Sequence, residues 1–276
     1  MNIELIALDL DGTLTDSKKE VSLRNRETVG RALEKGVQIA LVSGRPVMGI
    51  LPVARKLDLF EKGGYILAFN GGHILHCEKD QDGSEKLVTL KKEVIPLSCV
   101  PAIASVLSTY EVFPLTYNDI GVISENDENR YVKLEAYNNA IPVIRVPDLT
   151  EAVKEPVVKF MIVGEPKKLK PAGDYLKNAL GEEVNIFYSE PYFMEVTAPG
   201  IDKYSSLEWL SKKLNISREQ VMACGDGLND IPMLKFAGLS VVMGNAYDET
   251  KKYADHIVST NDEDGVAEAI ERFVLS

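Results

Sequence analysis

Residues 3–13 read Ile-Glu-Leu-Ile-Ala-Leu-Asp-Leu-Asp-Gly-Thr, an apolar run that ends in two carboxylates and a glycine. The apolar part predicts a strand that is buried on both faces, as in a parallel sheet. Open α/β sheets bind ligands at the carboxyl ends of such strands. Asp9 and Asp11 would repel each other there unless a cation or a proton lay between them. Taken alone, the segment also fits a simple turn, because Asp and Gly both favour turns.

The composition is that of an acidic globular protein. The chain has 276 residues, of which 45% are hydrophobic, and this predicts about two domains with a sizeable core. Its 42 acidic residues exceed its 31 lysines and arginines, for a net charge of −11. This charge argues against a nucleic-acid backbone or an anionic membrane as the partner. An anionic substrate would therefore need a local source of positive charge.

The sequence predicts neither a targeting segment nor a membrane span. Its first residues lack the basic start and the long apolar core of a signal peptide, and no apolar run approaches the ~18 residues of a membrane span. Cys77, Cys99 and Cys224 are odd in number and widely spaced, which fits reduced thiols better than a disulfide framework. His73 and His76 have no third ligand nearby, so a hairpin surface is favoured over metal binding. We expect a cytoplasmic protein, and the sequence specifies no oligomeric state.

Strands and helices alternate at both ends of the chain. Ser22 and Gly36 predict the start and the end of one helix, and Pro46 suits the first turn of another. Asn70-Gly71 is a hairpin turn signal. The alternation predicts a parallel sheet with right-handed crossovers. The expected strands of this sheet are residues 3–8, 37–42, 65–69, 193–196, 221–224, 239–243 and 256–258.

A different pattern occupies the middle of the chain. Residues 79–84 are polar and rich in turn formers, and the strands and helices expected after them are more mixed. The first pattern resumes after Pro191. We therefore predict a doubly wound, Rossmann-like α/β core made of residues 1–84 and 191–276, with an α+β domain, residues 85–190, inserted between its two parts.

Polar residues follow three of the expected core strands. They are Asp9 and Asp11, then Ser43 and Gly44, then Asp226, Asn229 and Asp230. Parallel strands place their carboxyl ends along one edge of a sheet, so these residues should converge, and Lys203 on the preceding helix can reach the same edge. Each has an ordinary structural interpretation, such as a helix cap for Ser43 or a solvated helix residue for Lys203. Their joint position at strand ends favours a functional site.

These stretches resemble the motifs of the haloacid dehalogenase-like hydrolases. The resemblance is greatest to the Cof-like sugar phosphatases, which carry a large α/β cap between their second and third motifs. Residues 9–13 match motif one, 43–45 motif two, Lys203 motif three and 225–230 motif four. The inserted segment matches the cap in size and position only. Tyr204 is a departure, because many relatives carry glycine there, and a tyrosine could crowd the phosphate.

The resemblance implies a Mg²⁺-dependent phosphatase that acts on small phosphorylated metabolites through an aspartyl-phosphate. Asp9 would be the nucleophile, and Asp11 the general acid and then the general base. Mg²⁺ would be held by Asp9, the main-chain carbonyl of Asp11 and Asp226, with Asp230 supporting the metal site. The groups implied for the phosphate are the side chains of Ser43 and Lys203, the N–H groups of Leu10 and Gly44, and Asn229, which would orient either the phosphate or Lys203.

Other interpretations remain open at this point. A phosphomutase shares the motifs but protects its phosphoenzyme from water until a second sugar arrives. A non-catalytic phosphoacceptor, such as a signalling receiver, is disfavoured by Asp11 and the inserted domain, and a degenerate phosphometabolite-binding protein by the intact motifs. Arg45 could contact the substrate, although pairing with a surface acid is favoured. Candidate substrates include hexose phosphates, pyridoxal phosphate and flavin mononucleotide.

Overall fold

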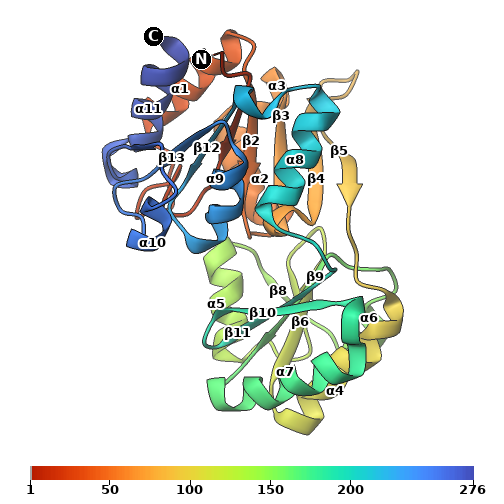
Figure 1. Cartoon of the computed structure of the whole chain (residues 1–276). Coiled ribbons are helices and arrows are strands. Elements are labelled where there is room, and N and C mark those ends of the chain that lie inside the picture. The colour runs from red at the N-terminus through yellow and green to blue at the C-terminus, as the bar shows by residue number, and fades with distance from the viewer. Residues whose placement is uncertain (1) are drawn as a thin grey trace. The chain divides into compact units, whose positions relative to one another are not determined.

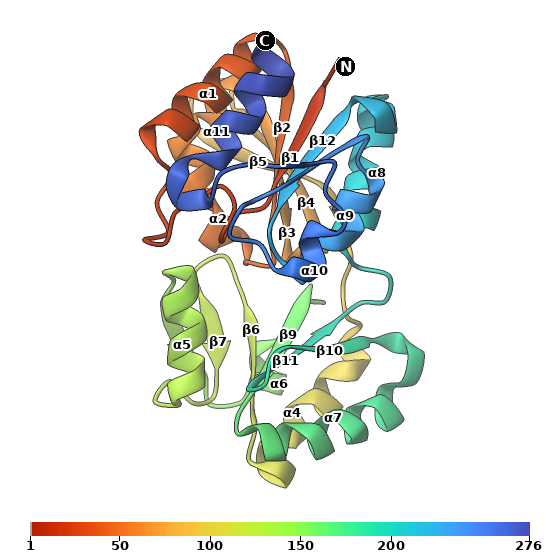
Figure 2. The ribbon, with the colours of Figure 1, turned by 60° about the vertical axis from the view of Figure 1, so that its left-hand side comes forward.

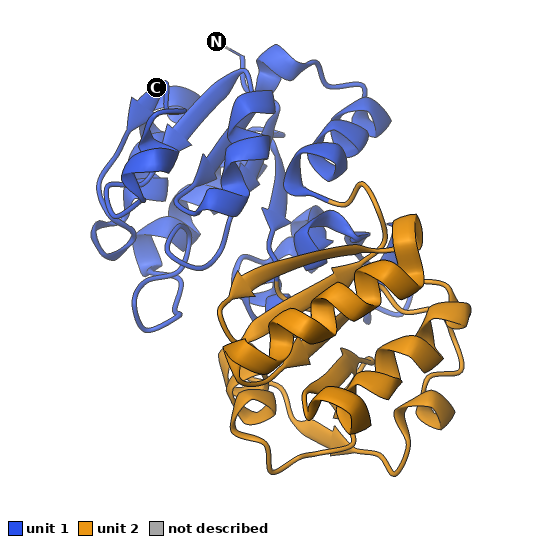
Figure 3. Ribbon diagram, turned by 60° about the horizontal axis from the view of Figure 1, so that its bottom comes forward, with its two compact units in different colours: residues 1–44, 50–91, 202–276 blue, residues 45–49, 92–201 orange. Residues whose placement is uncertain are grey.

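The computed structural model describes residues 2–276, which form two compact units (Figure 3). Unit 1 runs up to Gly44 and includes Ile50–Lys91 and Asp202–Ser276, whereas unit 2 consists of Arg45–Gly49 and Lys92–Ile201. The breaks around the long inserted segment lie at residues 91–92 and 201–202, later than the predicted 84–85 and 190–191.

Two strands account for this shift. β5 (Glu85–Lys92) lies at the edge of the unit 1 sheet, next to β4 (His73–Lys79). β11 (Phe193–Thr197), predicted as a core strand, pairs antiparallel with β9 (Lys159–Val163) and β10 (Asn185–Glu190) in the sheet of unit 2. All residues of β11 are buried, so its short apolar run looks the same as a strand of a parallel core. Only its pairing partners distinguish the two cases.

The sheet of unit 1 has the strand order β14-β13-β12-β1-β2-β3-β4-β5 (Figure 1). β1 (Leu5–Leu8) lies between β12 (Val221–Gly225) and β2 (Gln38–Val42) and is parallel to both. β4 is antiparallel to its neighbour β3, as the Asn70-Gly71 signal predicts. The predicted α/β fold with a parallel sheet is confirmed. The outer parallel strands are β3 (Gly64–Ala68), β13 (Leu239–Val242) and β14 (His256–Ile257).

Helices cover both faces of this sheet (Figure 2). α1 (Leu23–Glu34) and α11 (Gly265–Ile270) pack together on one face, and α8 (Lys203–Leu214) and α9 (Ile231–Phe236) on the other. Ser22 caps α1 by accepting a hydrogen bond from the N–H of Asn25, as its residue type predicts. The shorter or peripheral helices are α2 (Val47–Lys56), α3 (Leu59–Lys62) and α10 (Asp248–Lys251).

Alternating residues of the strands divide the core of unit 1 between the two faces. Leu5 and Ala7 of β1 join the apolar cluster that contains Leu207 and Leu210 of α8. Successive side chains of a strand point to opposite faces, so a fully apolar strand such as β1 supplies both layers. β1 is buried along its whole length, and this fixes the position of the residues that follow it.

Unit 2 is built on a separate sheet with the order β10-β11-β9-β6-β7-β8. On β9, Phe160 and Ile162 belong to the apolar cluster of α4 and α7, whereas Met161 and Val163 belong to that of α5. The remaining elements are β6 (Phe113–Tyr117), β7 (Val122–Ser124), β8 (Val143–Arg145), α4 (Val100–Tyr110), α5 (Arg130–Asn139), α6 (Leu149–Ala152) and α7 (Pro166–Leu180).

Across residues 2–276, no helix combines the length and the apolar character that crossing a lipid bilayer requires.

The packing of α8 on the sheet leads to a stability prediction. Leu210 is fully buried in the unit 1 core, so Leu210→Ala should lower the free energy of unfolding by about 2–5 kcal/mol through lost contacts and a cavity. Leu23, on α1 of the same unit, is 69% exposed, and Leu23→Ala should change it by less than about 0.5 kcal/mol. Urea denaturation followed by circular dichroism measures both. Similar losses in the two variants would contradict the assigned core.

Candidate active site

The candidate site lies at the carboxyl ends of β1, β2 and β12. Asp9 directly follows β1, Ser43 follows β2, and Asp226 follows β12. β1 is paired in register with both neighbours, since Leu8 lies opposite Leu41 and Cys224. The next residues of the three strands therefore emerge side by side. The parallel topology is what collects these polar residues from distant parts of the chain.

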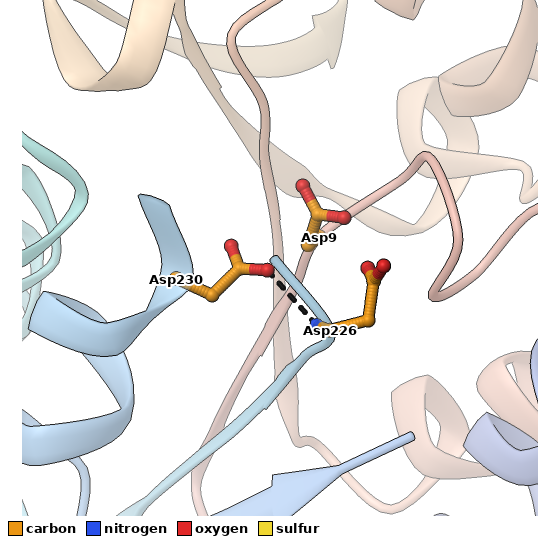
Figure 4. A group of neighbouring side chains, drawn as sticks. All are labelled: Asp9, Asp226 and Asp230. Atoms are coloured by element: carbon orange, nitrogen blue, oxygen red, sulfur yellow. Dashed lines mark hydrogen bonds between the residues drawn. The ribbon is translucent and has the colours of Figure 1, made fainter. Parts of the chain in front are cut away.

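Three carboxylates gather at this edge (Figure 4). One oxygen each of Asp9, Asp226 and Asp230 lies within 4.8 Å of the other two. Asp230 ends a short helical turn after β12, and its Oδ2 accepts hydrogen bonds from the N–H groups of Asp226 (2.9 Å) and Gly227 (2.8 Å). Asp230 thus closes the loop after β12 through these two hydrogen bonds, which hold the backbone of Asp226 in place.

Lys203 supplies the positive charge of this cluster. Its Nζ lies 2.6 Å from Oδ1 of Asp9 and 2.6 Å from Oδ1 of Asp230, and its side chain is fully buried. Lys203 is the first residue of α8, and Asp202 caps this helix through a capping box with Ser205. The positive end of a helix dipole disfavours a lysine at this position. The two carboxylates therefore hold the ammonium there.

The buried charges alter one another's protonation. Burial raises the pKa of Asp9 well above its usual range, and the negative charge of Asp230 adds to the rise. Burial also raises the pKa of Asp226 to about 6, against the effect of a hydrogen bond from Thr13. Burial would lower the pKa of Lys203, but the charges of Asp230 and Asp9 raise it above its ordinary value. Three carboxylates face one ammonium, so the cluster favours an additional cation.

The turn after β1 is fitted against Asp226. Gly12 has a φ of +83°, and a Cβ there would lie 2.4 Å from Oδ2 of Asp226, so the close approach requires glycine. Thr13 donates from Oγ1 to Oδ1 of Asp226 at 2.7 Å. Asn245 donates from Nδ2 to the main-chain oxygen of Gly12 at 2.8 Å. Thr13 lies in the first motif segment but had no predicted role, and Asn245 lies outside the four motif segments.

Asp11 differs from the other acids of the site. Its residue is exposed, whereas Asp9 is buried, and the group of three neighbouring carboxylates among the described residues does not include it. The two acids of the first motif therefore occupy different environments two residues apart. A buried carboxylate held by a lysine suits a fixed position, and an exposed one suits exchange of protons with water.

Ser43, Gly44 and Asn229 are connected through a residue that had been assigned only to a turn. Ser43 is buried, and its carbonyl accepts a hydrogen bond from the N–H of Asn70 at 2.9 Å. The side chain of Asn70 lies against Gly44, and its Oδ1 accepts a hydrogen bond from Nδ2 of Asn229 at 3.4 Å. The signal that found Ser43, a polar residue after a core strand, also applied to Asn70. The Asn70-Gly71 pair predicts a hairpin turn, and this interpretation assigned no role in the site to the Asn70 side chain.

Two side chains that the motifs left undecided have local partners. One guanidinium nitrogen of Arg45 donates to the carbonyl of Gly49, in the first turn of α2, at 3.1 Å. The hydroxyl of Tyr204 donates to Glu208 at 3.1 Å, and its ring meets that of Phe236 edge-on, with centroids 5.6 Å apart. Tyr204 thus contacts residues of α8 and α9. Lys203 retains its ion pairs with Asp9 and Asp230.

The residues of the cluster fit a hard divalent cation. Mg²⁺ prefers oxygen ligands and is commonly bound through one or two carboxylates. Asp9 and Asp226 offer such oxygens. Both oxygens of Asp230 already accept hydrogen bonds, from Lys203, Asp226 and Gly227, so Asp230 fits a supporting position.

Known proteins resemble this chain over nearly its whole length. The profile of the haloacid dehalogenase-like hydrolase family matches residues 6–270. The 5-amino-6-(5-phospho-D-ribitylamino)uracil phosphatase YcsE of Bacillus subtilis is 31% identical over 280 residues, covering 100% of this chain and 97% of the relative. A phosphoglycolate phosphatase of Methanobrevibacter smithii is 30% identical, with 100% of each chain covered.

Solved structures of the same family share the fold over the whole chain. A haloacid dehalogenase-like hydrolase from Bacteroides thetaiotaomicron has a TM-score of 0.89 and 44% identity, covering 98% of this chain and 99% of that one. A sugar phosphatase of subclass IIB has a TM-score of 0.78 and 25% identity, covering 99% and 100%. The chain therefore belongs to the haloacid dehalogenase-like hydrolases and is a phosphatase of this family.

Proposed function

We propose that this phosphatase is Mg²⁺-dependent and hydrolyses small phosphorylated metabolites, sugar phosphates or similar monoesters, through a phosphoaspartate at Asp9. The observation that carries the proposal is the buried Lys203 ammonium, 2.6 Å from both Asp9 and Asp230, with Asp226 in the same carboxylate group. This arrangement combines a nucleophile, a positive charge for phosphate and oxygen ligands for a cation at one sheet edge.

Asp9 is the proposed nucleophile. Burial disfavours its ionised form, and the ammonium of Lys203 opposes that effect. Lys203 contacts Oδ1, which leaves Oδ2 to attack phosphorus. A bond forms between this oxygen and phosphorus while the bond from phosphorus to the ester oxygen breaks, and the alcohol leaves.

Asp11 is the proposed proton carrier. It would give its proton to the departing ester oxygen and then take a proton from the water that attacks the phosphoaspartate. This second step releases inorganic phosphate and restores Asp9. The exposed position of Asp11 supports the role, because the residue must exchange protons in every cycle.

The metal would be held by the carboxylates of Asp9 and Asp226 and the main-chain carbonyl of Asp11, with Asp230 holding Asp226 and Lys203 in place. When bound, Mg²⁺ would offset the negative charge of the carboxylates and the phosphate. Phosphate oxygens would be bound by Lys203 and Ser43, by the N–H groups of Leu10 and Gly44, and by Asn229. These groups concentrate positive charge at one point of an acidic protein.

The activities for which the relatives are named support a small monoester as the substrate. These activities concern a phosphoribitylaminouracil, phosphoglycolate and sugar phosphates, which share a phosphate on a small polar alcohol. We propose that unit 2 acts as the cap that selects the alcohol part.

The three cysteines are free and buried, which fits the reducing cytoplasm expected for such an enzyme.

The nucleophile can be tested by an isosteric change. Asp9→Asn should lower the release of phosphate from p-nitrophenyl phosphate by about 10³-fold or more, because an amide oxygen is a poor nucleophile. Asp82→Asn, at an exposed turn of the same unit, is the matched control and should keep wild-type turnover. Wild-type turnover in Asp9→Asn would contradict the proposed mechanism.

The metal site can be tested by a measurement that does not depend on catalytic activity. Mg²⁺ binds the folded protein, so saturating Mg²⁺ should raise the melting temperature by about 5 °C. Asp226→Asn should lose most of this shift, while Asp82→Asn should retain it. Differential scanning calorimetry measures the shift, and a chelator should suppress phosphate release in the wild type. A shift that survives Asp226→Asn would place the cation elsewhere.

A further inference from the structure

The turn after β3 carries unusual backbone conformations. Phe69, Asn70 and Gly71 have φ values of 55°, 56° and 101°, so three consecutive residues are left-handed. Non-glycine residues in this region are strained and cluster at functional sites. Asn tolerates the conformation better than Phe does. The contacts of this turn must therefore compensate for the strain.

Asn70 contacts two segments of the active site. Its N–H donates to the carbonyl of Ser43 at 2.9 Å, which extends the pairing of β2 and β3 beyond the strands. A Cβ at Gly44 would lie 3.3 Å from both the Nδ2 and the Oδ1 of Asn70, so the amide packs directly on the Gly44 peptide. Its Oδ1 also accepts the hydrogen bond from Asn229 at 3.4 Å.

Gly71 joins the same turn to the helix of Lys203. A Cβ at Gly71 would lie 2.2 Å from Oγ of Ser206 and 3.0 Å from the carbonyl of Asp202. Ser206 donates to the carbonyl oxygens of Asp202 (3.1 Å) and Lys203 (3.2 Å) in the first turn of α8. Only glycine fits here, and the turn thereby packs on the helix end that carries Lys203.

The amide of Asn229 is fixed from both sides. A Cβ at Gly227 would lie 2.6 Å from Oδ1 of Asn229, so this oxygen rests on the glycine of its own loop. Nδ2 faces Asn70. Removal of the Asn70 amide would leave only one of these constraints, and the Asn229 side chain could rotate about its χ angles.

We propose that Asn70 is a positioning residue of the phosphatase site: its side-chain amide holds Asn229 and the Gly44 peptide in the orientation that receives the phosphate group. The assignment rests on the proposed function, in which Asn229 and Gly44 bind phosphate. The strained turn between β3 and β4 is then the means by which a third strand end contributes to the site.

Substitution of Asn70 by glycine distinguishes the contribution of the side-chain amide from that of the backbone conformation. Asn70→Gly keeps the left-handed conformation, which glycine adopts freely, and deletes only the side chain. Asn215 is the matched control, because it is also an asparagine with a left-handed φ (57°) in unit 1. It is exposed at the far end of α8, about 18 Å along the helix axis from Lys203.

The readouts are the affinity for inorganic phosphate in the presence of Mg²⁺, by isothermal titration calorimetry, and the steady-state constants for p-nitrophenyl phosphate. In Asn70→Gly, Kd and KM should rise together by about tenfold while kcat changes less, because an oriented ground-state contact is lost. Asn215→Gly should match the wild type in both. Equal effects of the two variants, or wild-type phosphate affinity in Asn70→Gly, would overturn the proposal.

A double-mutant cycle tests whether Asn70 acts through its neighbour. In an Asn229→Ala background, Asn70→Gly should weaken phosphate binding much less than in the wild type, because the group that it holds is already absent. Full additivity would overturn the assignment. If the wild type binds phosphate but releases none from p-nitrophenyl phosphate, the proposed function is wrong, and the binding comparison still decides the role of Asn70.

Discussion

The active site depends on one buried ion-pair network, the contact of the Lys203 ammonium with Asp9 and Asp230. These bonds join residues that are 194 and 27 positions apart in the chain. Removing one partner of such a network leaves an uncompensated buried charge, which costs about 3–5 kcal/mol. The two ends of the unit 1 chain are thus tied together at the point where the phosphate chemistry is proposed. The same lysine opposes the rise that burial causes in the pKa of Asp9.

The network also explains how an acidic protein can act on an anionic substrate. The chain carries a net charge of −11, and three of its carboxylates gather at the site. Burial and mutual repulsion raise the pKa of Asp9 and Asp226, because the single ammonium of Lys203 does not balance the three carboxylates. A divalent cation and a phosphate group together would balance this deficit. Recognition of the phosphate is therefore local, and the overall charge of the protein does not oppose it.

Close backbone approaches hold the acids and amides of the site at their positions. Glycine is required at Gly12 against Asp226 and at Gly71 against Ser206, because both residues have a positive φ and a Cβ would overlap the neighbouring atoms. The left-handed turn at Asn70 likewise brings a side chain into contact with Gly44 and Asn229. Strain in these turns is offset by contacts with neighbouring strands and with α8. The sheet supplies the rigid frame that such contacts need.

The sequence by itself determined the parallel α/β fold and the residues that meet at its edge. Apolar strands followed by polar motifs specify which side chains leave the sheet together, since parallel strands end on one side. Only the tertiary structure decided that β11 belongs to unit 2, that Asp230 is occupied by Lys203 and two N–H groups, and that Asn70 contacts Gly44 and Asn229. A short apolar run does not encode its pairing partner, and an Asn-Gly turn does not encode its distant neighbours. These features depend on contacts between residues far apart in the chain, which no local pattern specifies.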